Sequence, residues 1–286
     1  MDARFWLIQA FNGISYGALL FLVGSGLSLI FGVMRIVNLA HGSYFLLGGY
    51  VALSVIWTTG SWLLALPVAA LSIAALGLVM ERVFLQPLGF DPLRQVLLTV
   101  GFAFLFQQAA LDIWTGNNFD INPPEVLTQT VVIGGLYLPL YRLFMIAIAL
   151  AIGLFLWLMM EKTRLGATIR ATVDDAQMAR GVGIDTSLIS MLIFALGAFL
   201  AALGGVIGGA FLGIYPGLDF EMLPLAFAVV IIGGMGSLGG AAIGALLVGL
   251  ADNFGKALFP EVSYFTLYAP MALILAVKPT GLFGRE

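Results

Sequence analysis

The chain has 286 residues, of which 61% are hydrophobic and only 9% are charged. Soluble domains carry roughly 25% charged residues, so this composition excludes a soluble protein and indicates a membrane protein. The net charge of −3 leaves no basic surface for nucleic acid, and the absence of cysteine excludes disulfides and thiolate metal sites.

Apolar stretches recur from one end of the chain to the other. Each is about 20 residues long, which is enough for a helix to cross a hydrocarbon core of roughly 30 Å. The sequence therefore predicts an all-α fold, a polytopic helical membrane protein with about eight membrane segments in a single transmembrane domain over residues 1–286. The predicted segments are 5–31, 39–57, 62–80, 94–114, 142–160, 188–213, a glycine-broken stretch at 222–251, and 263–278.

The segment "RIVNLAHGSY" (35–44) is polar and lies between the first two apolar stretches. One interpretation is an interfacial turn in which Asn38 caps the following helix. The other is that the segment dips into the bilayer, because only 17 residues run from His41 to Trp57, which barely spans a membrane. In that case Asn38, His41 and Gly42 line the inner end of a solute path.

The longest polar connection covers residues 115–141. Within it, "TVVIGGLYL" resembles two short strands joined by a Gly-Gly turn. An irregular cap over the helical bundle is the alternative.

The segment 159–187 is rich in basic residues, which are retained on the cytoplasmic side of membranes. Counting spans outward from it places the N-terminus and residues 115–141 outside. A polar helix is predicted between Asp174 and Gly183, with acidic residues at its start and glycines at its end. Gly181 is expected to take the positive φ of the closing turn. An ordinary solvated interfacial helix is the alternative.

The stretch 223–250 is too short for two full helices and too rich in glycine for one. The sequence predicts two half-helices that enter from outside and return to outside, with residues 252–261 external and the C-terminus cytoplasmic. Broken backbone within a membrane is tolerated where it is buried in protein or lines a watery cavity. The candidate path residues here are Gly234, Gly236, Ser237 and Gly240. Most other glycines at four-residue spacings are expected to pack helices together.

Several activities are disfavoured by what the sequence lacks. It has no GxxxxGK[ST] motif for ATP, and a lone His41 cannot form a zinc site, so no cofactor and no metal are expected and the chain is not predicted to be an enzyme. A serine hydrolase using Ser237 would have Met235 where the GxSxG motif requires glycine. A proton-driven carrier usually has acidic residues deep in its spans, and none lies between residues 5 and 80.

Three strings together, "NLAHG", "GGMGSLGGAAIG" and "KPTGLFG", make the chain resemble the permeases of the branched-chain amino acid ABC transporter family, LivH type. The resemblance covers essentially the whole length. In addition "DAQMARG" is similar to the EAA loop of ABC importer permeases, with Asp175 for the first Glu, Ala176 matching, Gln177 for Ala and Gly181 in its place.

The resemblance implies a bacterial inner-membrane importer built from this permease, a second permease subunit, two cytoplasmic ATPases and a periplasmic substrate-binding protein. Membrane lipid is a further partner of the permease. It also implies that residues 161–187 form a cytoplasmic coupling loop that docks into the ATPase. Family members carry branched-chain or other amino acids, urea, short amides or aromatic acids. A passive channel for small polar solutes is the alternative from another class. The candidate coupling residues are Asp174, Asp175, Ala176, Arg180, Gly181 and Gly183.

Overall fold

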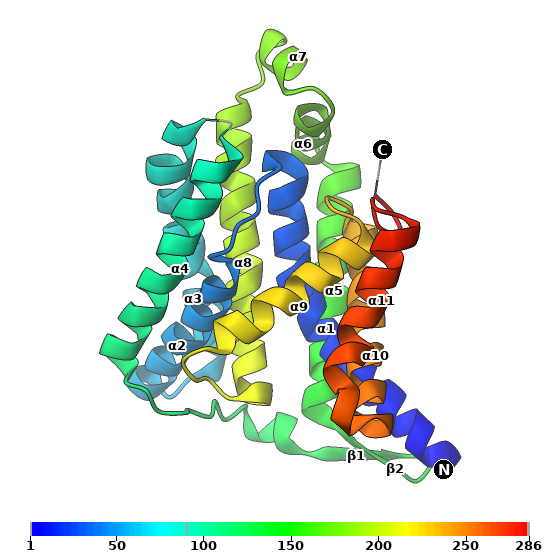
Figure 1. The fold of residues 1–286 in the computed structure, drawn as a ribbon. Coiled ribbons are helices and arrows are strands. Elements are labelled where there is room, and N and C mark those ends of the chain that lie inside the picture. The colour runs from blue at the N-terminus through cyan, green and yellow to red at the C-terminus, as the bar shows by residue number, and fades with distance from the viewer. Residues whose placement is uncertain (1, 90, 285–286) are drawn as a thin grey trace.

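The computed structural model describes residues 2–89 and 91–284, and it is a helical bundle with one small hairpin (Figure 1). Six helical stretches in the described residues are long and apolar enough to cross a membrane. Five of them are α1 (Ala3–Met34), α4 (Pro92–Trp114), α5 (Leu140–Lys162), α8 (Thr186–Leu212) and α10 (Leu238–Leu258). The sixth combines α3 (Trp62–Val79) with a π-helix, η1 (Met80–Leu85), and a 3-10 turn, η2 (Gln86–Leu88).

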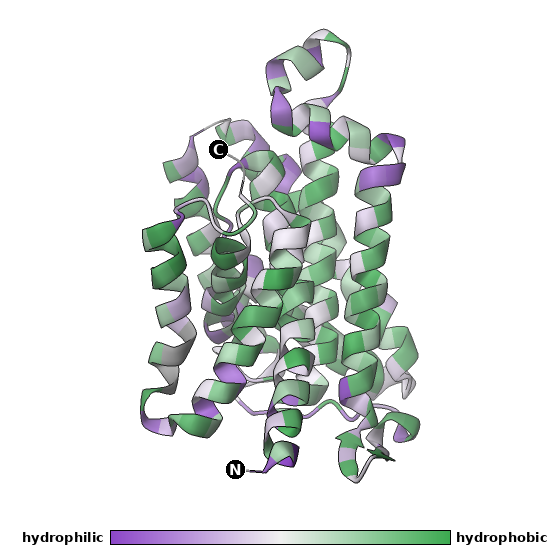
Figure 2. Ribbon diagram, turned by 90° about the vertical axis from the view of Figure 1, so that its right-hand side faces the viewer, coloured by the Kyte–Doolittle hydropathy of each residue, from purple (hydrophilic) through white to green (hydrophobic). Residues whose placement is uncertain are grey.

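Three further helices are shorter: α2 (His41–Thr59), α9 (Leu218–Gly233) and α11 (Ser263–Val277). The polytopic helical class is confirmed, whereas the total of about eight membrane segments stays a prediction, because it depends on how these three are counted. Figure 2 shows hydrophobic residues along the middle of the helices and hydrophilic residues gathered at the two ends. This distribution is the one expected of a bundle whose middle lies in lipid.

The centre of the bundle is formed by α1 and α8, which are the most buried of the long helices. Small residues allow their close packing. A Cβ on Gly13 would lie 2.9 Å from the Leu250 side chain of α10, and a Cβ on Gly197 would lie 2.5 Å from the Ile30 side chain of α1. The prediction that glycines at four-residue spacings pack helices is confirmed at Gly13 and Gly17, both of which face α10.

The first departure from regular helices follows α1, which ends at Arg35 in a left-handed conformation with φ of 54°. Residues 35–40 then run back into the bundle without helical structure, as the thin blue tube between α1 and α2 shows in Figure 1. The helix α2 begins only at His41. Residues 36–44 are therefore inside the protein and do not form an interfacial turn, while Arg35 is exposed.

The glycine-rich stretch differs from the prediction. It contains no pair of half-helices, because α9 begins at Leu218 and α10 continues to Leu258 as a full-length helix, so residues 252–258 are helical and not a loop. The turn of residues 234–237 joins them at the same end of the bundle as the end of α1, since a Cβ on Gly236 would lie 2.9 Å from Cα of Gly32. The chain does return to the end from which it entered, as predicted (Figure 1).

The predicted hairpin is confirmed. Strands β1 (Thr130–Ile133) and β2 (Leu136–Pro139) pair antiparallel around Gly134 and Gly135, after a 3-10 turn, η3 (Glu125–Thr128). The hairpin and the N-terminus lie at one end of the bundle (Figure 1). Two short helices, α6 (Arg164–Asp174) and α7 (Ala176–Gly181), lie at the other end together with the chain after α11.

Candidate translocation site

The start of α2 lies deep in the bundle. The His41 ring forms a hydrogen bond of 3.0 Å through Nε2 with the carbonyl oxygen of Val23, and both His41 and Asn38 are completely buried. Val23 is eleven residues from the end of α1 at Met34, or about 16 Å along the helix. The polar segment thus reaches far into the membrane-spanning part of the bundle, as the second interpretation of the sequence required.

Asn38 does not cap α2. The N-cap residue is Ala40, and the Asn38 side chain instead accepts a hydrogen bond of 3.1 Å from the Ala40 amide within the turn. The neighbouring amide of Leu39 donates to the Thr99 hydroxyl of α4 at 3.2 Å. These bonds satisfy backbone groups that have no helical partner in residues 35–40, which explains how irregular backbone is tolerated at this depth.

The start of α2 meets the start of α9. The Ser43 hydroxyl donates to Oδ2 of Asp219 at 3.1 Å, and Asp219 is buried. Gly42 permits the approach, because a Cβ there would overlap the carbonyl oxygen of Asp219. The sequence analysis missed Asp219, since it began this segment at residue 222. The signal was present in "PGLDFE", where two acids follow a glycine, as they do in the first turn of a helix.

Replacing Ser43 with alanine is expected to destabilise the protein by about 1–3 kcal/mol, because it removes a donor from a buried carboxylate. Thr58→Ala is the matched control, since the exposed Thr58 hydroxyl donates only to carbonyls of its own helix. Thermal unfolding in detergent measures both. Equal unfolding temperatures for the two variants would mean that the Ser43–Asp219 bond contributes nothing to stability.

A groove of about 350 Å³ lies between α1, the irregular segment and the far half of α9. Every residue that lines it is apolar, so it offers no group that would bind a charge. Pockets that take small molecules are mostly apolar, with a few polar groups nearby to orient the ligand. The lining residues are Leu27, Phe31, Val37, Leu39, Phe227, Val230, Ile231 and Met235.

The predicted path residues of the glycine-rich turn have packing contacts in the structure. Gly234 and Gly236 have φ of 102° and 80°, which side chains other than glycine rarely adopt. Ser237 caps α10 by accepting from the Gly240 amide at 3.0 Å, and a Cβ on Gly240 would overlap backbone atoms of Gly233. Gly234, Gly236 and Ser237 therefore build a tight turn, and Gly240 packs the start of α10 against the end of α9. The place of these four residues on a path stays a prediction.

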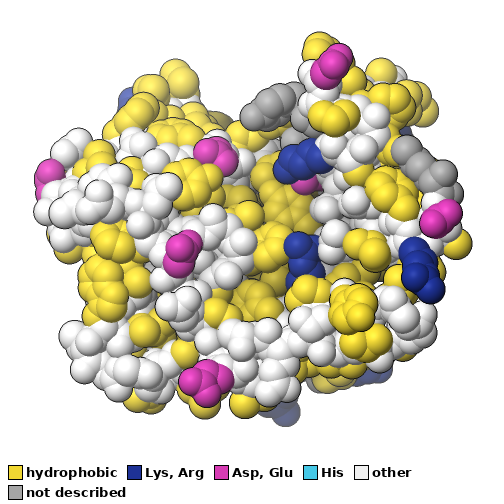
Figure 3. All heavy atoms as spheres, turned by 90° about the horizontal axis from the view of Figure 1, so that it is seen from below, with side chains coloured by type: hydrophobic (Ala, Val, Ile, Leu, Met, Phe, Trp, Pro, Cys, Tyr) yellow, Lys and Arg dark blue, Asp and Glu magenta, His cyan; other side chains and the backbone are white. Residues whose placement is uncertain are grey.

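The opposite end of the bundle is hollowed. Figure 3, seen from the hairpin side, shows hydrophobic side chains in the floor of the hollow and Lys or Arg side chains at its edge. At this end Arg142 donates to the Asn12 side chain at 2.7 Å, and Lys256 pairs with Asp252 at 2.7 Å. Charged groups are thus held in place at this end by protein partners.

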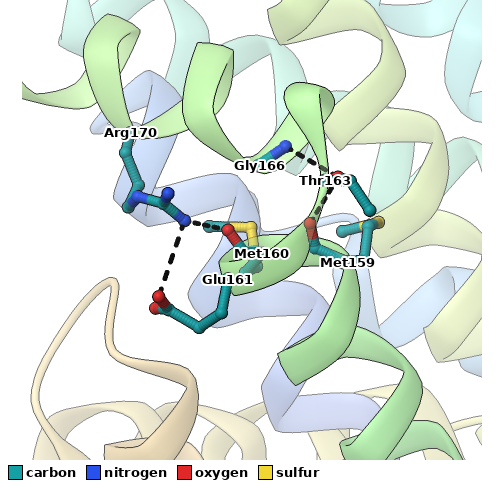
Figure 4. A network of polar contacts seen from close by, with 6 residues as sticks. All are labelled: Met159, Met160, Glu161, Thr163, Gly166 and Arg170. Atoms are coloured by element: carbon teal, nitrogen blue, oxygen red, sulfur yellow. Dashed lines mark hydrogen bonds and ion pairs between the residues drawn. The ribbon is translucent and has the colours of Figure 1, made fainter.

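The elbow between α5 and α6 is fixed by a small polar network (Figure 4). Thr163 caps α6 by accepting from the Gly166 amide at 3.1 Å, and its hydroxyl donates to the Met159 carbonyl at 2.6 Å. Arg170 of α6 donates to the Met160 carbonyl and lies 3.9 Å from the Glu161 carboxylate. The direction of α6 relative to α5 is therefore well defined.

The predicted polar helix is two helices. Asp174 is the last residue of α6, and Asp175 is the residue that caps α7, accepting from the Gln177 and Met178 amides at 2.9 Å each. The expectation for Gly181 was wrong: it remains helical, and Gly183 takes the positive φ of 89° because the turn closes two residues later.

The short helix α7 is the most protruding part of its end of the bundle (Figure 1). Arg180 ties it to α8, because its Nε donates to the Thr186 hydroxyl at 2.8 Å. Ala176 begins the helix, and two apolar side chains, Met178 and Val182, are 67% and 71% exposed. An anchored helix with uncovered apolar side chains can serve as a contact surface for another protein.

Comparison with known proteins identifies the family. The family model described as branched-chain amino acid transport system / permease component matches residues 9–275. The chain belongs to this family. The permease is 31% identical to the high-affinity branched-chain amino acid transport system permease protein LivH of Escherichia coli K12, over 98% of this chain and 96% of that protein. It is 29% identical to BraD, the permease protein of the same kind of system in Pseudomonas aeruginosa, over the same shares.

The chain is also similar to proteins with other names. The permease is 27% identical to the autoinducer 2 import system permease protein LsrC of Salmonella paratyphi B, over 88% of this chain and 72% of that protein. No solved structure matches the chain significantly. Membership therefore establishes a transport permease, while the names of the relatives differ in the solute.

Proposed function

We propose that the chain is the membrane subunit of an ATP-binding cassette importer for branched-chain or other hydrophobic amino acids. The observation that carries the choice of solute is the groove between α1, residues 35–40 and α9, in which all lining residues are apolar. An aliphatic side chain gains free energy when it leaves water for such a surface, while urea and short amides have no comparable apolar part to bury. The ammonium and carboxylate groups of the same amino acid would keep polar partners outside the groove. The near full-length similarity to LivH and BraD supports the same solute class.

The proposed assembly contains a second permease subunit of the same family, two cytoplasmic ATPases that hydrolyse ATP, and a periplasmic substrate-binding protein. Its place is the bacterial inner membrane. Lys162, Arg164, Arg170 and Arg180 lie on or beside α6 and α7, which supports a cytoplasmic position for that end. The N-terminus and the hairpin would then be periplasmic and the C-terminus cytoplasmic.

The coupling loop would be residues 161–187, with α7 docking on the ATPase. The fixed elbow at Thr163 connects α7 to α5 through α6, and the bond from Arg180 to Thr186 connects α7 to α8. A movement of the ATPase would be transmitted through these contacts to α8, which packs against α1 and α2 beside the groove. The path would open through residues 35–42 and the turn at 234–240.

Uptake in proteoliposomes tests this function. Vesicles containing the permease, its ATPases and its binding protein are expected to accumulate radiolabelled leucine only with ATP, with unlabelled isoleucine and valine competing. Urea and autoinducer 2 serve as comparison solutes. Leucine entry that continues after the ATPases are omitted would show a passive channel, and competition by urea alone would overturn the solute assignment.

A further inference from the structure

A second pocket, of about 390 Å³, lies beneath α7, at the end of the bundle away from the hairpin. Its walls come from the end of α1, from η1 and η2, from the start of α4 and from α6, α7 and α8. Unlike the groove, it is rich in polar side chains. The polar residues used below are Glu81, Gln86, Gln95, Arg180, Asp185 and Ser187.

Glu81 is the unusual group in this pocket. The residue is only 2% exposed, and its Oε2 atom has no hydrogen-bond partner among the described residues. It lies in the π-helix η1, an arrangement that is uncommon in proteins and frequently found at functional sites. A buried carboxylate is costly unless a positive or hydrogen-bonding group accompanies it, so this position calls for a partner.

The neighbouring side chains have partners elsewhere. Gln86 bonds with Arg82 and Ser187, and Gln95 donates to the Gly89 carbonyl at 2.6 Å. Asp185 caps α8 by accepting from the Ser187 and Leu188 amides at 3.0 Å each. Among the described residues that line the pocket, Glu81 is therefore the one with a buried side-chain oxygen that has no partner, and its carboxylate selects for a positive group.

We propose that this pocket binds a free amino acid whose ammonium group pairs with Glu81. Arg180, in the wall formed by α7, adds a positive charge that suits the carboxylate of the same molecule, while its Nε stays bonded to the Thr186 hydroxyl. The ligand would thus bridge the π-helix and α7. Because α7 packs chiefly against α6 and α8, an occupied pocket would restrain it and slow transport when amino acid accumulates on this side. Only this regulatory consequence rests on the proposed function.

Calorimetric titration of the full-length chain in nanodiscs tests the binding site without any transport. Three probes of similar shape are used: leucine, 3-methylbutylamine with the ammonium group alone, and 4-methylpentanoate with the carboxylate alone. Leucine is expected to bind most tightly and the amine less tightly, because the amine lacks the carboxylate that faces Arg180. The acid is expected to bind least, because it leaves Glu81 without a partner and brings a second carboxylate into the pocket. Glu81→Gln is expected to weaken the binding of leucine and of the amine by at least tenfold. Glu125→Gln, which removes an exposed carboxylate in η3 at the hairpin end of the bundle, is the matched control and should leave both affinities unchanged.

Two results would overturn the proposal: binding of 4-methylpentanoate as strong as that of the amine, or equal leucine affinity in the wild-type protein and Glu81→Gln. If Glu81→Gln does not fold, Ser190→Leu fills the pocket from α8 and should abolish leucine binding; retained binding contradicts the site.

In proteoliposomes, leucine on the α7 side should slow uptake by the wild type and not by Glu81→Gln. Failure of all uptake would refute the proposed function, while the titration would still decide the site.

Discussion

Replacing Gly205 with alanine is expected to reduce sharply the amount of folded protein in detergent extracts. Gly205 of α8 lies against α2, and a Cβ there would overlap the carbonyl oxygen of Phe45 and lie 3.0 Å from the amide nitrogen of Gly49. Both obstacles are backbone atoms, so no side chain can rotate away. The helices would have to separate, and overpacking of this kind costs about 1–3 kcal/mol or more. Fluorescence-detected size-exclusion chromatography measures the remaining folded fraction.

Gly101→Ala is the control for Gly205→Ala. Gly101 is also in a long helix, α4, but nothing lies within 4 Å of the position that its Cβ would occupy. Alanine favours the helix by about 1 kcal/mol over glycine, so this variant should be as stable as the wild type or slightly more stable. A folded Gly205→Ala protein with normal uptake would show that the α2–α8 contact tolerates separation.

The long helices could be predicted from the sequence because their apolar composition is that of segments in contact with lipid. Residues 94–114 and 142–160 were predicted within two residues of the ends of α4 and α5. These helices are among the least buried of the six, so their residues are chosen by contact with lipid and carry a strong apolar signal. The all-α class followed from the same signal.

The limits of α9 and α10 were missed because both helices include charged residues. The prediction stopped where acids appeared, yet Asp219 is stabilised by Ser43 and Asp252 by Lys256, four residues along the same helix. A contact between residues 43 and 219 is tertiary and leaves no trace in local composition. The pairing of Asp252 with Lys256 was visible at its spacing, and it favours helix through these residues.

How deep residues 35–40 lie in the bundle could not be decided from the sequence, for a related reason. The sequence shows a polar string next to a short apolar helix, and that pattern fits both an interfacial turn and a buried segment. The partners that decide between them are the Val23 carbonyl of α1 and the Thr99 hydroxyl of α4. Neither could be recognised as a partner before the helices were placed.

Met178→Asp is expected to separate the permease from its ATPases while leaving it folded in the membrane. Met178 and Val182 are four residues apart, so they share one face of the chain around α7, and both are exposed at the protruding end of the bundle. If this face fills a groove of the ATPase, a charge placed there must be buried unpaired. Loss of an anchor side chain of this kind costs about 2 kcal/mol or more, which corresponds to a loss of roughly thirtyfold in affinity.

The measurements for Met178→Asp are the amount of ATPase that co-purifies with the tagged permease and ATP-driven leucine uptake, both of which should fall at least tenfold. Val126→Asp is the matched control, because Val126 is 66% exposed but lies in η3, at the hairpin end of the bundle. It should retain its ATPases. If Met178→Asp leaves co-purification and uptake intact, the apolar face of α7 is not the docking surface. Coupling would then have to pass through other residues at this end of the bundle, among them those of α6.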